Sequence, residues 1–66
     1  MTTEIDYLTA AEWLVNHYES VPGIWEQFDL DHAALSLTDN ALDLKLTSYD
    51  DLPTLDLMCI MADSRM

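Results

Sequence analysis

Few side chains in this sequence of 66 residues could do chemistry. The candidates are His17, His32, Cys59 and the carboxylates around them. A metal site would need paired ligands at a spacing such as C-x-x-C or H-x₃-H, and neither spacing is present. General acid–base catalysis needs a cleft that raises the pKa of one carboxyl group, and a domain this small rarely builds one. We therefore expect no enzyme activity, no metal site and no cofactor.

Carboxylate is the abundant group. The chain has 13 acidic residues against two basic ones, Lys45 and Arg65, and a net charge of −11. A globule of this length has a radius of gyration of about 11 Å, so its charge per unit length is comparable with that of nucleic acid. Repulsion among these charges does not stabilise the folded state. We interpret it as a source of solubility or as a surface for a strongly basic partner, and we expect neither nucleic acid nor an anionic membrane as a direct ligand.

The candidate partner-binding residues lie between positions 29 and 60 of the chain. We expect one acidic surface from Asp43, Asp50, Asp51 and Asp56, and a second patch from Asp29 and Asp31. An apolar contact is expected from Met58 and Ile60, which the strand pattern described below directs away from the core. Coverage of these two residues by the C-terminal tail is the alternative. A homodimer is the simplest form of the contact.

The elements that must position these residues begin with a helix. Residues 9–23 place apolar side chains at i, i+3, i+4 and i+7, and Thr9 with Glu12 fits a capping box. The Pro22–Gly23 pair should end this helix. A second short helix or helical turn is expected within 24–33. We expect four aromatic residues to be core rather than a binding site: Trp13, Tyr18, Trp25 and Phe28.

From residue 34 the apolar period changes from about 3.6 to 2. Leucines alternate with polar residues over 34–38 and 41–48, and a third apolar run covers 54–61. Asp39-Asn40 suits a two-residue hairpin turn, and the second hairpin sets Lys45 opposite Asp56. A helical interpretation of 32–38 explains less of the pattern. We predict a single acidic α+β domain over residues 1–66: an N-terminal helix, with the second short helix, packed on a three-stranded antiparallel β-meander.

The single cysteine excludes an internal disulfide and is typical of a reducing compartment. We expect Cys59 to be a small buried apolar residue. The first residues lack the basic region and long apolar run of a signal peptide, and no stretch approaches the roughly 18 apolar residues of a membrane span. We therefore expect a cytoplasmic protein that makes no membrane contact.

A small single domain with many carboxylates on a short α+β frame resembles the acidic inhibitors that phages and mobile elements encode. These include anti-CRISPR and anti-restriction proteins that mimic DNA. The resemblance covers the whole chain in general character, without a shared motif that would carry a residue's role across. It implies a non-enzymatic protein that occupies the basic nucleic-acid channel of a host enzyme. The alternative is a small structural or regulatory homo-oligomer whose acidity serves only solubility.

Overall fold

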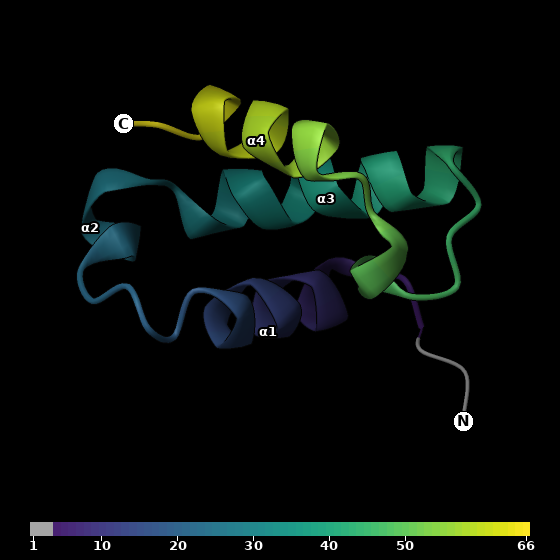
Figure 1. Cartoon of the computed structure of the whole chain (residues 1–66), viewed down its shortest axis with the longest axis horizontal. Coiled ribbons are helices and arrows are strands. Elements are labelled where there is room, and N and C mark those ends of the chain that lie inside the picture. The colour runs from purple at the N-terminus through teal and green to yellow at the C-terminus, as the bar shows by residue number, and fades with distance from the viewer. Residues whose placement is uncertain (1–3) are drawn as a thin grey trace.

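The computed structural model describes residues 4–66, and these form a helical domain. In chain order the elements are α1 (Tyr7–His17), α2 (Ile24–Gln27), α3 (Leu30–Asp43), the short 3₁₀ helix η1 (Tyr49–Asp51) and α4 (Thr54–Asp63). Helix α3 lies in the middle, with α1 on one side and α4 on the other (Figure 1). The only β-pairing among the described residues is an isolated antiparallel bridge between Phe28 and Arg65. The predicted α+β class with a three-stranded meander is therefore wrong.

Helix α1 confirms the expected N-terminal helix, with different ends. Its N-cap is Asp6, whose carboxylate accepts the Thr9 N–H at 2.8 Å, while the Thr9 hydroxyl accepts the Asp6 N–H at 3.1 Å. Thr9 is thus the third helical residue of a capping box and not the cap itself. The helix ends at His17, five residues before Pro22. The pair Pro22–Gly23 instead leads into α2.

The expected second helix is split into two. Helix α2 covers four residues after Gly23, whose φ of 78° is a left-handed conformation that glycine adopts at no steric cost. Phe28 and Asp29 are then extended, which interrupts the helix. Asp29 caps α3 by accepting the His32 N–H at 3.3 Å.

Helix α3 replaces the first predicted strand, the Asp39-Asn40 turn and the start of the second strand. Its buried face consists of Ala33, Ala34, Leu37 and Ala41, which recur at helical spacing. The strand prediction followed the leucines, yet Leu35 and Leu42 are each 58% exposed. Alanine is the strongest helix former and lets neighbouring helices approach closely, so three alanines mark this face instead.

A Schellman motif ends α3 where the second strand was expected to continue. The Leu46 N–H donates to the Ala41 carbonyl at 2.9 Å, and the Lys45 N–H donates to the Leu42 carbonyl at 3.1 Å. Lys45 occupies the left-handed position of the motif with a φ of 57°. It therefore caps a helix, and the predicted cross-strand pair of Lys45 with Asp56 is wrong because neither residue is in a sheet.

Helix α4 replaces the third strand over 54–61. Its inner face is Leu57, Ile60, Met61 and Ser64, again at helical spacing. Ile60 is 6% exposed, so it belongs to the core, and its predicted role in a partner contact is wrong. Met58 is 60% exposed, as the contact requires. Cys59 is exposed and not buried as expected, because it lies on the outer face of the helix with Leu55 and Met58.

The core lies between the three long helices and is closed by the C-terminal segment. Leu14 of α1 and Leu37 of α3 are its largest fully buried side chains. The Asp29 N–H donates to the Ser64 carbonyl at 2.8 Å, and the Met66 N–H donates to the Gln27 carbonyl at 3.0 Å. These bonds hold the end of the chain against the α2–α3 junction.

Candidate functional site

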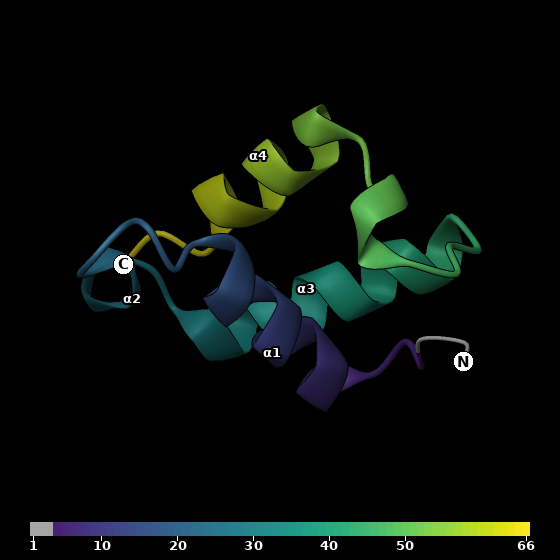
Figure 2. The same cartoon turned by 60° about the horizontal axis from the view of Figure 1, so that its bottom comes forward.

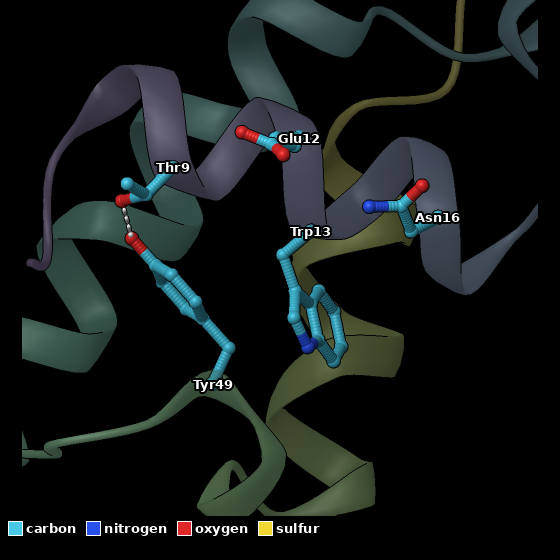
Figure 3. Close-up of a pocket in the computed structure, with 5 residues that line it drawn as sticks. All are labelled: Thr9, Glu12, Trp13, Asn16 and Tyr49. Carbon is cyan, nitrogen blue, oxygen red and sulfur yellow. Dashed lines mark hydrogen bonds between the residues drawn. The ribbon is translucent and has the colours of Figure 1, made fainter. Parts of the chain in front are cut away.

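The segment η1 is held on α1 by two aromatic side chains. Tyr49 is 2% exposed, and its hydroxyl donates to the Asp6 carbonyl at 3.1 Å and lies 2.9 Å from the Thr9 hydroxyl (Figure 3). The Trp13 Nε1–H donates to Asp50 Oδ1 at 3.1 Å. These bonds join residues that are 37 to 43 positions apart in the chain. The turn that carries Asp50 and Asp51 is therefore fixed and not a free loop.

Local bonds also shape η1. The Ser48 hydroxyl accepts the Asp50 N–H at 3.2 Å and caps the turn. Asp50 and Asp51 remain exposed although their backbone is fixed. A carboxylate on an ordered backbone loses less conformational entropy when it binds than one on a flexible loop.

The first predicted set of acids is brought to one end of the molecule. Asp43 is the last residue of α3, Asp50 and Asp51 lie in η1, and Asp56 is in the first turn of α4. The end of α3 and the beginning of α4 flank η1, and Tyr49 bonds η1 to the beginning of α1, whereas α4 begins on the other side of the molecule from α1 (Figures 1 and 2). We call this surface the acidic end and define it by six residues: Glu4, Asp6, Asp43, Asp50, Asp51 and Asp56.

The acidic end holds six of the 13 acidic residues and one of the two basic ones, Lys45. Asp6 and Asp56 are half-buried and the other four acids are exposed. The remaining seven acids are distributed over the other segments, so negative charge is present on every helix. Negative charge is thus more concentrated at the acidic end, although the whole molecule is negatively charged.

The second predicted patch, Asp29 and Asp31, lies at the beginning of α3, at the opposite end of that helix from Asp43. Both carboxylates accept hydrogen bonds from within the fold. Asp29 caps α3, and the Asp31 carboxylate accepts a hydrogen bond from the Tyr7 hydroxyl. That bond, followed by desolvation and the negative charges of Asp31 and Asp29, raises the pKa of Tyr7 above its ordinary value. Tyr7 thus links Asp31 to the beginning of α1, where Asp6 of the acidic end lies, whereas Asp29 lies at the α2–α3 junction.

An open groove runs beside the acidic end. Its volume is about 250 Å³ and it lies between α1 and η1 (Figure 3). We call it the aromatic groove and define it by the residues that line it: Thr9, Glu12, Trp13, Asn16 and Tyr49. The Trp13 and Tyr49 ring centroids are 5.9 Å apart, with the planes tilted by 40°. No sequence pattern indicated this groove, because its two walls are far apart in the chain.

The potential metal ligands and nucleophiles do not form a centre. Within residues 4–66 no three His, Cys, Asp or Glu side chains lie close enough together to hold a metal ion. His32 Nδ1 is instead 3.0 Å from the buried Ser64 hydroxyl, and His17 stacks on Trp13. None of the helices in this part of the chain combines the length and apolar character needed to cross a membrane.

Comparisons with protein-family models, with curated proteins and with solved structures found no match to this chain.

Proposed function

We propose that the protein is a non-enzymatic binding module whose acidic end docks on a Lys/Arg-rich, nucleic-acid-binding surface of a partner protein and blocks it. The observation that supports this most is the fixed η1 turn, where Trp13 and Tyr49 hold Asp50 and Asp51 in place beside four more acids. Electrostatic complementarity of this kind makes association fast and sensitive to salt. Phage-type inhibitors that mimic DNA act in this way, and such a role would place the protein in a host cytoplasm.

Two matched triple variants test whether the position of the acids matters. The first, Asp43→Asn/Asp51→Asn/Asp56→Asn, neutralises the acidic end. The control, Glu19→Gln/Glu26→Gln/Asp63→Asn, removes the same charge from the far end of the molecule. Each triple changes one acid in the first turn of a helix, one at the last residue of a helix and one in a turn or loop. Their effects on helix dipoles should therefore be similar.

The immobilised wild type and both variants are exposed to a bacterial lysate, and retained proteins are identified. We expect the wild type and the control to retain the same basic, nucleic-acid-binding protein, which added duplex DNA displaces. Retention should fall at least about tenfold between roughly 50 and 200 mM salt, as for a contact made of several ion pairs. The acidic-end variant should retain none. Equal retention by both variants, or retention indifferent to salt and DNA, would contradict the proposal.

A specific observation favours a second candidate, the homo-oligomer. Helix α4 presents an apolar stripe to solvent, which we call the α4 outer stripe: Leu55, Met58, Cys59 and Ala62. These positions follow helical spacing, and Leu55 and Met58 are 73% and 60% exposed. Two copies could pair through this stripe. The net charge of −11 on each copy opposes the pairing, so it ranks second.

Analytical ultracentrifugation separates the two candidates. A homodimer through α4 should dissociate on dilution, should form more readily as salt screens the charges, and should be abolished in Leu55→Gln/Met58→Gln. Leu8→Gln is the control, because Leu8 is a leucine of α1 with a similar exposure of 74%. A single monomeric species at every concentration would exclude this candidate and leave the first.

A further inference from the structure

We propose that the aromatic groove is a receptor for one arginine side chain of the basic partner. The biological occupant follows from the proposed function, whereas the chemistry of the site stands on the groove itself. The groove is open to solvent, and its volume of about 250 Å³ accommodates a side chain and not a whole ligand of drug size. Its lining combines two aromatic rings with a carboxylate and an amide (Figure 3).

The aromatic part suits a cation. His17 stacks on one face of the Trp13 indole, with ring centroids 4.5 Å apart and planes within 14° of parallel. Trp13 also lines the groove, so part of its ring is accessible there. A guanidinium within about 6 Å of an indole centroid is attracted by the ring quadrupole, and tryptophan is the strongest such partner. The Tyr49 ring is buried and packs 5.9 Å from Trp13, so it supports the tryptophan and leaves the cation–π contact to Trp13.

The polar part supplies acceptors for the donors of a guanidinium. Glu12 is exposed on the groove and supplies a carboxylate. The Asn16 side chain lies one turn further along α1 and adds a polar amide to the lining of the groove. Asp50 adds a second carboxylate at the edge of Trp13, where the Nε1–H bond holds it at 3.1 Å. Arginine has five donors in a planar fork and no acceptor, which matches this set better than the compact ammonium of lysine.

The site is already formed without a ligand. Tyr49 is buried and bonded to Thr9 and to the Asp6 carbonyl, and Trp13 is bonded to Asp50, so both rings are fixed by the fold. A preformed site loses little conformational entropy when it binds. This rigidity distinguishes the groove from a surface acid that merely attracts any cation.

N-acetyl-arginine amide is the probe, and N-acetyl-lysine amide at the same concentration and ionic strength is the control. Binding is followed by NMR through the indole N–H of Trp13 and the side-chain amide of Asn16. The indole N–H of Trp25 is an internal reference, because Trp25 belongs to α2 and does not line the groove. We expect the arginine probe to shift the Trp13 and Asn16 signals saturably and to leave Trp25 unchanged.

Two variants sharpen the test. Glu12→Gln should weaken binding of the arginine probe at least about threefold, the scale of one exposed ion pair. Glu19→Gln removes the same charge from outside the groove and should leave binding unchanged. Equal responses to arginine and lysine, equal shifts at Trp13 and Trp25, or equal effects of the two variants would each overturn the inference.

The outcomes also separate this inference from the proposed function. If the arginine probe fails while the acidic-end variant still loses its partner, the groove is not the receptor and the binding module remains. If the probe binds and no basic protein is retained from the lysate, the groove binds arginine and the proposed function fails.

Discussion

Lys45 is the residue whose conformation is least suited to its side chain. It is the only residue other than glycine with a positive φ among those described, and the Schellman motif at the end of α3 requires that conformation. A side chain with a Cβ is strained there, whereas glycine is not. Lys45→Gly should therefore raise the free energy of unfolding by about 0.5–1 kcal/mol. Glycine relieves the backbone strain of the folded state, but it also adds conformational entropy to the unfolded chain, which offsets part of the gain.

Urea unfolding measures this change, and Lys45→Ala is the matched control. Both variants remove the lysine charge from the acidic end, so any difference between them reports the backbone alone. We expect Lys45→Ala to be no more stable than the wild type. Identical stability of the two variants would show that the left-handed conformation is not strained.

The bond between Tyr7 and Asp31 gives a prediction for alkaline pH. It raises the pKa of the Tyr7 hydroxyl above the 10.0 of an unperturbed tyrosine, and the carboxylate of Asp31 is the first cause. Because the native pKa is higher than the unfolded one, this bond contributes stability that is fully present below the unfolded pKa. That stability is lost as the pH rises through the native pKa.

Asp31→Asn should accordingly lower the pKa of Tyr7, as followed by NMR of the tyrosine ring carbons through a pH titration. Asp39→Asn removes the same charge from the exposed side of the same helix and is the control. A Tyr7 pKa that falls equally in both variants would mean that net charge, and not the hydrogen bond, sets it.

At the scale of elements, the sequence predicted α1 but placed its end at Pro22–Gly23 and not at His17, and it did not predict α3 or α4. In α1 the buried Ala10 and Leu14, with the partly buried Trp13, follow the i, i+3, i+4 spacing, so the helical period is visible. In α3 alanines mark it, while Leu35 and Leu42 face solvent and produce an alternation that imitates a strand. The low content of β-branched residues in 34–47 was a signal for helix that the leucine pattern obscured.

Leu35 and Leu37 discriminate directly between helix and strand. Two residues apart, they would share one face of a strand, but in α3 Leu37 is fully buried and Leu35 is 58% exposed. Leu37→Ala should lower the free energy of unfolding by about 2–5 kcal/mol, and Leu35→Ala by about 0.5 kcal/mol or less. Circular dichroism during chemical unfolding measures both. Similar losses at the two positions would contradict the helix.

At the scale of the whole molecule, the grouping of four predicted acids does not depend on the predicted fold. Asp43, Asp50, Asp51 and Asp56 are close in sequence, and the chain turns between them whether its neighbours are strands or helices. The aromatic groove was not predictable in the same way. It depends on contacts between α1 and η1, whose residues are nearly 40 positions apart, and only the tertiary packing brings these together.

The net charge determines how this molecule should respond to salt. The radius of gyration is 11.1 Å and the longest dimension is 31 Å, so at about 0.01 M salt, where the screening length is about 30 Å, the acids repel one another across the whole fold. The unfolded chain spreads the same charge over a radius of gyration of about 25 Å, so repulsion disfavours the folded state more. Sodium chloride at about 0.15 M shortens the screening length to about 8 Å and should raise the free energy of unfolding.

The urea midpoint at the two salt concentrations measures this response, and sodium chloride is preferred to sulfate because sulfate also strengthens apolar burial. The control is the triple variant Glu19→Gln/Glu26→Gln/Asp63→Asn, which reduces the net charge from −11 to −8. Because repulsion scales with the square of the charge, its response to salt should be about half that of the wild type. In the wild type, a urea midpoint that stays constant or falls with salt would contradict this prediction. It would show that local hydrogen bonds, such as those of Asp29, Asp31 and Asp50, stabilise the acids more than their mutual repulsion destabilises the fold.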